Sequence, residues 1–453
     1  MTQGSSLEDQ SSSVSRRRVL QGLALGAGAV AATPLLAACG SSSTTSTTSS
    51  APAASGSSTT AGGGSVSFGS NASDAVPKKA YADVFAAFTK ASGTDVKVNT
   101  VDHNTFQEQI NTYLQGSPDQ AFTWFSGYRM RFFADQGLST DISSVWDKIG
   151  GDFNDSFKGA STGNDGKQYF VPFYYYPWAL FYRKSVFKDL GIDATAIKTI
   201  DDLKAAGAKM KAKGLIPIAF ADKDGWPAMG TFDYINVRTN GYDFHVSLMA
   251  GKEKWTDPKV KAVFTNWADL LPLHQEGSLG RTWQDAAGAL LNKKAGMYLL
   301  GMFVGQQFPE GPDRDDLDFF PFPQIEASFG VDTVEAPIDG FMLSKATDNV
   351  DGGKALLEYL GSADAQNIYL ASDPNNVGTN NKTDTTKYNA LQKKAAELVG
   401  AAKHITQFLD RDTRPDFAST VMIPSIQQFI GKPTEIDKLL ESIEQQKQAI
   451  FTA

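Results

Sequence analysis

The stretch SVSFGSNASDAVPKKAYADVFAAFTKASGTDVKVNTV, residues 65–101, decides the fold class of this chain. Its first six residues are β-prone, and its last eight alternate in the manner of a strand. Between them, large apolar residues recur at helical spacing until a glycine ends the helix, namely Tyr81, Val84, Phe85 and Phe88. TFQEQINTYLQG at 105–116 and QAFTWFSG at 120–127 continue with a helix and a strand. This order predicts an α/β fold, with a parallel sheet covered by helices.

The same order of elements returns later in the chain. TIDDLKAAGAKMKAKG at 199–214 predicts a helix that begins with Thr199 and Asp202 as a capping box, and LIPIAF at 215–220 predicts a buried strand. A strand pair and two helices are then expected at 318–323, 340–345, 352–361 and 434–451. The chain after residue 64 is long enough for two domains. We therefore expect a second α/β lobe.

The first 38 residues predict an export signal, because a basic segment precedes an apolar run that ends in small residues. A permanent membrane span is the alternative, since the run approaches the ~20 residues that cross a bilayer. Its many glycines and alanines would make it a weak anchor. SRRRVL at 15–20 resembles the twin-arginine export signal through Arg16 and Arg17, with Val19 where phenylalanine is usual. LAACG at 36–40 resembles the lipobox of bacterial lipoproteins, in which the cysteine is acylated and the chain is cut before it.

Cys39 is the only cysteine among 453 residues, so we interpret it as this lipid attachment point and as no part of a disulfide or a catalytic pair. The segment 39–64 is rich in serine, threonine and glycine, which predicts a flexible tether. The net charge is −8 and becomes −9 without the first 38 residues, which carry three arginines and two acidic residues. An acidic chain argues against nucleic acid as a partner.

The sequence shows no recognisable catalytic motif. It contains no Gly-x-Ser-x-Gly elbow, no P-loop and no dinucleotide fingerprint. The four histidines, His103, His245, His274 and His404, are not at metal-ligand spacing. We therefore expect no cofactor, no metal and no enzymatic activity. A pair of carboxylates across a cleft, as in a glycosidase, remains the catalytic alternative.

The segment PFYYYPWALFY, residues 172–182, holds seven aromatic residues among eleven. In a strand, Tyr174, Tyr176 and Trp178 would share one face, and Phe173 and Tyr175 the other. Two interpretations remain open: a buried core between layers, or the wall of a binding site. The second suits tyrosine and tryptophan, because each offers a flat apolar face with a polar group at its end.

Two further segments mix aromatic residues with aspartate and glycine. They are FTWFSGYRMRFF at 122–133 and ADKDGWPAMG at 221–230. Both lie near the ends of predicted strands, where open α/β sheets bind ligands. Sugar rings suit such surroundings, since their C–H faces stack on aromatic rings while their hydroxyls bond to carboxylates and amides.

Taken in order, several segments make the chain similar to the substrate-binding lipoproteins of carbohydrate ABC transporters, a family that includes maltose-binding proteins, and to its actinobacterial members. The segments are TWFSGYRMRFFADQGL, PFYYYPWALFYRKSVFKDLGI, TIDDLKAAGAKMKAKGLIPIAF, KKAGMYLLGMF, DGFMLSK and ITQFLDRDTRPDFA. The resemblance covers residues 65–453. It implies a two-lobed periplasmic-binding-protein-like α/β fold, with a ligand cleft between the lobes that closes by hinge motion.

The resemblance also implies where the chain crosses between the lobes. Crossings are expected near Tyr174–Ala179, Phe320–Gln324 and Gly361–Gln366. Lobe 1 would then comprise 65–175 and 322–363, and lobe 2 would comprise 176–321 and 364–453.

Carried over residue by residue, the resemblance implies a set of ligand-binding side chains. They are Asn71, Asp102, Asn104, Trp124, Ser126 and Tyr128 from lobe 1, Tyr174, Tyr176 and Trp178 from the hinge wall, Asp224 and Trp226 from lobe 2, and Asp339, Asp410 and Arg411. Many family members have tryptophan where this chain has Phe303, which leaves stacking at that position open. Structural roles are the alternative, with Asp339 supporting a turn and Asp410 paired to Arg411.

The function implied is capture of a monosaccharide or oligosaccharide and its delivery to the permease subunits of an ABC transporter. The resemblance implies a monomer that is lipid-anchored through Cys39 on the extracytoplasmic face of the cell membrane. Two alternatives remain: a non-sugar cargo such as a polyamine, an amino acid or a metal chelate, and a secreted lipoprotein glycosidase.

Overall fold

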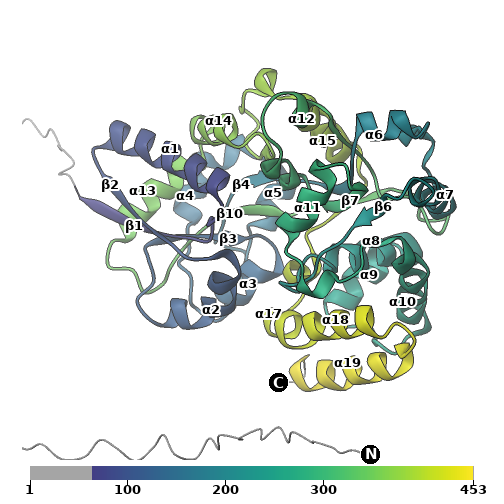
Figure 1. Ribbon diagram of the computed structural model, residues 1–453. Helices are drawn as coiled ribbons and strands as arrows, with labels where there is room; N and C mark the ends of the chain where they lie inside the picture. Colours follow the sequence, from purple (N-terminus) through teal and green to yellow (C-terminus); the bar gives the residue numbers. More distant parts are fainter. Residues whose placement is uncertain (1–63, 452–453) are drawn as a thin grey trace, which may run out of the picture. The chain divides into compact units, whose positions relative to one another are not determined.

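The computed structural model of the protein describes residues 64–451 (Figure 1). The expected export signal with Arg16 and Arg17, the acylation site Cys39 and the tether up to residue 63 lie outside the described residues. These expectations therefore stay predictions.

Six strands form the larger sheet, in the order β11–β4–β10–β3–β1–β2. Their bounds are β1 Ser65–Ser70, β2 Asp95–Thr100, β3 Ala121–Phe125, β4 Val171–Tyr175, β10 Ile338–Leu343 and β11 Val377–Gly378. β1 is parallel to β2 and β3, as the alternation of strands and helices predicts. β10 is antiparallel to β3 and β4. The sheet is therefore mixed, because β10 enters it from the other sheet and not through a crossover helix.

Seven helices accompany this sheet in the chain. They are α1 Ala75–Ser92, α2 His103–Gln115, α3 Tyr128–Asp135, α4 Ser143–Ile149, α5 Asp155–Ala160, α13 Val350–Leu360 and α14 Ala363–Ser372. The four apolar residues that predicted α1 are all buried in it. The helix ends at Gly93, whose φ of 72° is a left-handed conformation that glycine adopts without strain.

The second sheet has four strands, in the order β6–β7–β5–β8. Their bounds are β5 Trp178–Arg183, β6 Ile216–Ala219, β7 Ala295–Gly301 and β8 Leu317–Phe320. β6 is parallel to β7, whereas β5 is antiparallel to both β7 and β8. A separate pair of parallel strands joins β9 Thr333–Glu335 to β12 His404–Thr406.

Residues 64–451 contain twelve further α-helices, several of which contact the second sheet. They are α6 Lys184–Asp189, α7 Ile200–Lys211, α8 Met229–Asn240, α9 Tyr242–Met249, α10 Pro258–Leu270, α11 Trp283–Leu291, α12 Pro312–Asp315, α15 Ala390–Ala401, α16 Leu409–Asp412, α17 Pro415–Phe417, α18 Ile423–Gly431 and α19 Ile436–Phe451. The capping box that predicted α7 is present, since Thr199 and Asp202 bond reciprocally to each other's backbone N–H. The C-terminal helices α18 and α19 lie beside α10, at the end of the chain (Figure 1).

Two residues, Tyr176 and Pro177, separate β4 from β5, so the aromatic segment leaves one sheet and enters the other within a single turn. This is where the first crossing is expected. The chain next leaves the four-stranded sheet at Phe320 and reaches the six-stranded sheet at Ile338. The two strands predicted at 318–323 and 340–345 are present as β8 and β10, but they belong to different sheets and do not pair with each other. Pro321 and Pro323 lack the N–H that a continuing strand would need.

The division into lobes stays a prediction as a whole, but its last boundary needs revision. Helix α14 packs against α1, and β11 extends the six-stranded sheet by pairing with β4. Residues 363–378 therefore lie with the first sheet, and not with lobe 2 as expected for 364–453. The chain passes beyond this sheet only after Gly378, so the crossing expected near Gly361–Gln366 lies later.

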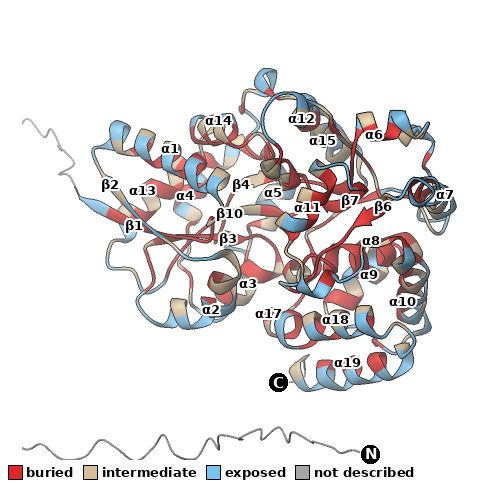
Figure 2. Cartoon of the chain, in the orientation of Figure 1, coloured by how far each residue is buried: buried red, intermediate tan, exposed pale blue. Residues whose placement is uncertain are grey.

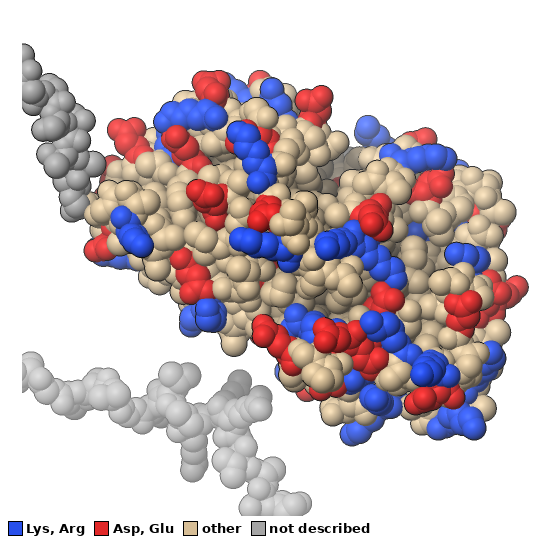
Figure 3. Space-filling model, turned by 90° about the horizontal axis from the view of Figure 1, so that it is seen from above, with Lys and Arg blue, Asp and Glu red and all other residues tan. Residues whose placement is uncertain are grey.

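Buried residues run along both sheets and along the inner faces of their helices (Figure 2). The strands β3, β5 and β7 are buried at every position, because helices or loops cover both of their faces. On the face seen in Figure 3, acidic and basic side chains are interspersed, without a stripe of one sign. Within residues 64–451, no helix combines the length and apolarity that crossing a bilayer requires.

Candidate functional site

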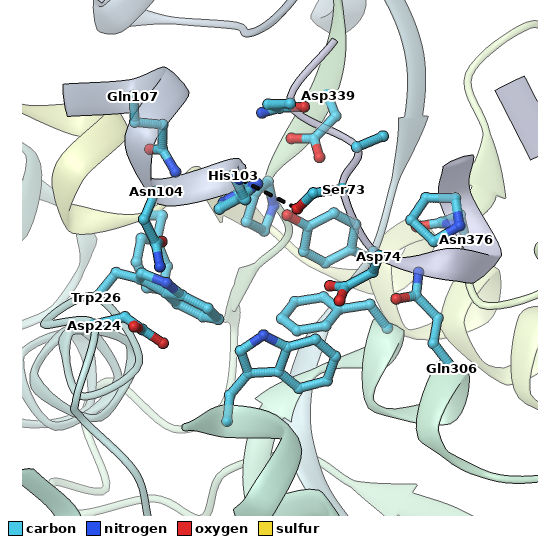
Figure 4. Close-up of a pocket in the computed structure, with 18 of the residues that line it drawn as sticks. Ser73, Asp74, His103, Asn104, Gln107, Asp224, Trp226, Gln306, Asp339 and Asn376 are labelled. Carbon is cyan, nitrogen blue, oxygen red and sulfur yellow. Dashed lines mark hydrogen bonds between the residues drawn. The ribbon is translucent and has the colours of Figure 1, made fainter. Parts of the chain in front are cut away.

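A pocket lies where residues from the two sheets meet, with a volume of about 1070 Å³ that includes solvent space at its mouth. Its walls come from the β1–α1 loop, the start of α2, the crossing between β4 and β5, the β6–α8 loop, the start of α11 and the segment 408–411. Figure 4 shows Asn104, Asp224 and Trp226 on one side of the cavity, and Asp74, Gln306 and Asn376 on the opposite side. Polar groups from distant parts of the chain therefore converge on one space.

Eleven of the fourteen predicted site residues line this pocket. They are Asn71, Asp102, Asn104, Tyr174, Tyr176, Trp178, Asp224, Trp226, Asp339, Asp410 and Arg411. The two faces of the aromatic segment differ: Tyr174, Tyr176 and Trp178 line the pocket, while Phe173 packs on Phe341 at 4.9 Å between ring centroids. Successive side chains point to opposite faces of a strand, so in β4 and the residues that follow it, alternate aromatic residues face the pocket.

Aromatic rings form much of the pocket wall. Trp178 and Trp226 meet edge to face, with centroids 6.3 Å apart and planes at 85°. Phe303 meets Trp283 at 5.2 Å and 87°. Phe303 thus lines the pocket, and whether it stacks on a ligand stays a prediction. Among the described residues, the buried Nε1 of Trp226 has no hydrogen-bond partner, so a ligand oxygen could accept from it.

Arg411 joins several of these groups. Its Nη1 donates to Asp339 Oδ1 at 2.5 Å, and its Nη2 donates to Tyr176 Oη at 3.1 Å. The guanidinium also stacks on Phe125, 3.8 Å from the ring centroid. Burial raises the pKa of Asp339, and the charge of Arg411 opposes that shift. The expected pairing of Asp410 with Arg411 is long, at 4.0 Å, because Asp410 has a closer partner.

That partner is Arg129 of α3, whose Nη1 lies 3.2 Å from Asp410 Oδ2 and 2.6 Å from Gln107 Oε1. The other oxygen of Asp410, Oδ1, is buried and accepts no hydrogen bond from any described residue. A buried carboxylate oxygen without a partner is costly. We therefore regard Asp410 Oδ1 as an acceptor that is available to a ligand hydroxyl.

The segment 407–413 holds Asp410 and Arg411 in place. Its backbone is fixed to helix α8, since Leu409 N donates to Asp233 Oδ2 at 2.7 Å. Gln407 fixes it to the first sheet, because its Oε1 accepts from Ser126 Oγ at 2.8 Å and from Ile338 N at 3.0 Å. One short segment therefore contacts both halves of the pocket and supplies its charged floor.

The rim of the pocket contains carboxylates and one histidine. Asp102 is the N-cap of α2, and the bond it accepts from Thr105 N lowers its pKa. Burial raises the pKa of Asp224. Burial and the charge of Arg411 lower the pKa of His103 to about 4, so its imidazole is neutral near pH 7. His103 can therefore donate and accept hydrogen bonds without attracting anions.

Three predicted residues, Trp124, Ser126 and Tyr128, do not line this pocket. Trp124 is 1% exposed and packs on Phe125 and Phe133, because its strand β3 is covered on both faces. Ser126 is buried and bonds to Gln407. Tyr128 lies beside Arg131 and Arg414 in a separate surface hollow.

Several residues that were not predicted also line the pocket, namely Ser73, Asp74, His103, Gln107, Trp283, Gln284, Gln306, Asn376 and Phe408. Trp283 and Gln284 had a usable signal, since TWQD at 282–285 is a capping box at the start of a helix. Within residues 64–451, no cluster of histidine, cysteine or acidic residues could hold a metal ion.

Among solved structures, this chain is similar to the bacterial solute receptor AcbH, which is described as having an exclusive substrate preference for β-D-galactopyranose. The identity is 48%, the match covers 86% of this chain and all of that one, and the TM-score is 0.84. The GacH receptor of Streptomyces glaucescens shares the fold, with 17% identity, a TM-score of 0.72 and coverage of 86% of this chain and 99% of that one.

Curated relatives are more distant. An ABC transporter extracellular-binding protein of Pyrococcus horikoshii is 26% identical over 260 residues, which are 56% of this chain and 57% of that protein. A second protein of that organism matches over 64% of its own length, so the chain spans less than two thirds of both relatives. The family model for bacterial extracellular solute-binding proteins matches residues 71–367. The chain belongs to the family of bacterial extracellular solute-binding proteins.

Proposed function

We propose that this protein captures a sugar in the pocket between its lobes and delivers it to an ABC permease. The observation that carries the proposal is the combination of an aromatic wall with unpaired polar atoms, Trp226 Nε1 and Asp410 Oδ1. Sugars need both, because their C–H faces are apolar and their hydroxyls need partners. Relatives named for sugars support it, including the alpha-glucosides-binding protein AglE of Rhizobium meliloti.

The first candidate ligand is β-D-galactopyranose, which AcbH prefers. The neutral His103 and the paired charges of Arg411 and Arg129 fit an uncharged ligand. A site whose buried groups bond to specific hydroxyls strongly rejects a ligand that lacks them, since a buried polar group is then left unpaired.

Ligand capture would shift the lobes toward a closed arrangement, because the ligand contacts groups from both sheets at once. The closed surface would then be recognised by the permease. We further propose that the protein acts as a monomer without enzymatic activity, exported through Arg16 and Arg17. It would be held by an acylated Cys39 on the extracytoplasmic face of the cell membrane, since two or more acyl chains anchor stably.

Isothermal titration calorimetry with D-galactose, D-glucose, maltose and putrescine tests the proposal. We expect galactose to bind, and binding to weaken at least tenfold in Trp226→Ala and in Arg411→Ala. Lys79→Ala is the matched control, because Lys79 is exposed on α1 and lies outside the pocket. Binding of none of the sugars would overturn the proposal, and release of a product from an aryl galactoside would favour the glycosidase alternative.

A cationic cargo is the second candidate. Besides Asp339 and Asp410, which are paired with arginines, the carboxylates Asp74, Asp102 and Asp224 line the pocket. Burial raises the pKa of both Asp74 and Asp224, and the charge of Asp102 adds to each shift, so the three groups lie near one another. Binding of putrescine in the same calorimetry, without binding of any sugar, would support this candidate.

A further inference from the structure

Asp74 stands directly before helix α1, in the N-cap position, yet its side chain does not cap that helix among the described residues. Aspartate in this position usually accepts from the backbone N–H groups of the first turn. Here Asp74 Oδ1 accepts instead from Gln284 Nε2 at 3.4 Å, from a residue 210 positions later. We call this contact the Asp74–Gln284 bridge. It joins a helix of the six-stranded sheet to a helix of the four-stranded sheet.

The bridge brings the N-termini of two helices to one carboxylate. Asp74 precedes the 18 residues of α1, and Gln284 is the second residue of the nine-residue helix α11. Helix N-termini carry partial positive charge and stabilise a nearby anion. Burial raises the pKa of Asp74, and the bond from Gln284 opposes that shift. The nearby charge of Asp102 raises the pKa further, so the bond from Gln284 is the contact that favours the ionised carboxylate of Asp74.

The bridge also lies at the pocket. Asp74 and Gln284 both line it, and both are partly exposed, unlike the buried floor around Arg411. Figure 4 places Asp74 across the cavity from Asn104 and Asp224. A second contact spans the cavity near Asn104, where His103 meets Trp226 edge to face with centroids 6.4 Å apart.

We propose that the Asp74–Gln284 bridge closes the pocket behind a single sugar ring and thereby sets the upper size of the ligand. The proposal rests on the proposed function, in which the ligand is a sugar. In this proposal, a second ring linked to the first would take the space that the Asp74–Gln284 contact now closes at the pocket wall. The bridge would then have to open, which leaves a partly buried carboxylate without its partner. Gln284 is thus a specificity-determining residue that excludes longer ligands.

Calorimetry with two probes tests the size limit, using the chain from Thr60 onward, which forms one compact unit. The probes are D-galactose and lactose, which carries the same galactose ring with a second ring attached. We expect lactose to bind at least 30-fold more weakly than galactose. In Gln284→Ala and in Asp74→Ser, this ratio should fall at least tenfold. Asp74→Ser keeps a residue that can cap α1 but cannot reach Gln284.

Two variants serve as controls. Asp74→Asn keeps an oxygen that can accept from Gln284, so it should preserve the discrimination against lactose. Gln446→Ala removes an exposed glutamine on α19 that lies outside the pocket, and it should change neither affinity. If lactose binds the unaltered chain as tightly as galactose, or if Gln284→Ala leaves the ratio unchanged, the proposal is wrong while the sugar function stands.

A second measurement does not depend on the ligand. The chain from Thr60 has no cysteine, so spin labels at Lys78→Cys on α1 and Asn292→Cys after α11 report the distance between the two helices. Without ligand, Gln284→Ala should broaden this distance distribution, and Gln446→Ala should not. If neither sugar binds, galactose is not the ligand. A broadened distribution would then still support the bridge, whereas an unchanged distribution would overturn it.

Discussion

Arg411 Nη1 donates a hydrogen bond of 2.5 Å to Asp339 Oδ1, and this pair joins the segment 407–413 to strand β10 at the floor of the pocket. Both side chains are buried, with 9% and 17% of their surface exposed. A buried ion pair costs desolvation that only good geometry offsets. The third partner, Tyr176, lies between β4 and β5, so the pair also fixes the point at which the chain crosses between sheets.

Removal of one member of this pair should therefore destabilise the folded protein. Arg411→Ala should lower the free energy of unfolding by about 3–5 kcal/mol, because it leaves Asp339 buried without its counter-charge. The double variant Arg411→Met/Asp339→Asn should recover part of that loss, since no buried charge remains. Chemical denaturation of the single and double variants checks this. Equal losses for Arg411→Ala and the double variant would contradict a role for the charge.

Trp226 and Trp124, which were both predicted to bind the ligand, should respond differently to substitution. Trp226→Ala should weaken sugar binding at least tenfold, or about 1.4 kcal/mol, with a nearly unchanged melting temperature, because Trp226 lines the pocket and is only partly buried. Trp124→Ala should lower the free energy of unfolding by about 3–5 kcal/mol, because it empties a core position. Calorimetry and thermal denaturation of both variants separate the two roles, and weak binding in a fully folded Trp124→Ala protein would contradict them.

Trp124 and Trp226 illustrate which features of the site can be predicted from the sequence. The strand that carries Trp124 was predicted correctly, as were the elements around it. The burial of β3 depends on α13, which packs on it, and on β10, which lies next to it in the sheet, and both come more than 200 residues later. No local pattern contains that information. The period of two did separate Tyr174 from Phe173, because in that segment one face meets the pocket and the other meets the core.

The pocket residues that were not predicted also depend on contacts between distant parts of the chain. Gln284 and Asp74 are ordinary polar residues at helix starts, and only the packing of the two lobes brings them together. The misplaced last boundary also has a tertiary cause, since β11 has only two residues and joins the first sheet through β4. Such a strand has no periodicity to detect.

Asp222 should make stability depend on pH. Burial raises its pKa to about 7 in the folded protein, against an ordinary value near 4 in the unfolded chain. The folded state therefore holds a proton that the unfolded state loses, and the stabilisation is complete below pH 4. It falls as the pH rises toward 7, by at most about 1.4 kcal/mol per pH unit.

Asp222→Asn should remove this contribution, because asparagine does not titrate and its oxygen can still accept from Ala228 N, at 3.0 Å in the present structure. Between pH 4 and pH 7 the parent should lose stability relative to Asp222→Asn, so the variant should become the relatively more stable protein as the pH rises. Urea denaturation at pH 4, 5.5 and 7 measures it. A difference that stays constant across these values would show that Asp222 is ionised in the folded protein.

Gly230 should control the position of a pocket wall. It lies at the start of α8, and a Cβ there would come within 2.5 Å of the ring of Trp178 and 3.2 Å of Phe408. Real atoms do not approach so closely, so Gly230→Ala must displace Trp178, which lines the pocket. We expect weaker sugar binding and a loss of stability of about 1–3 kcal/mol, although alanine is the better helix former.

Gly288 of α11 is the matched control, because a Cβ there meets no described atom within 4 Å. Gly288→Ala should raise stability by up to about 1 kcal/mol and leave binding unchanged. If Gly230→Ala binds sugar as the parent does, the close packing of Trp178 on α8 does not position the pocket wall.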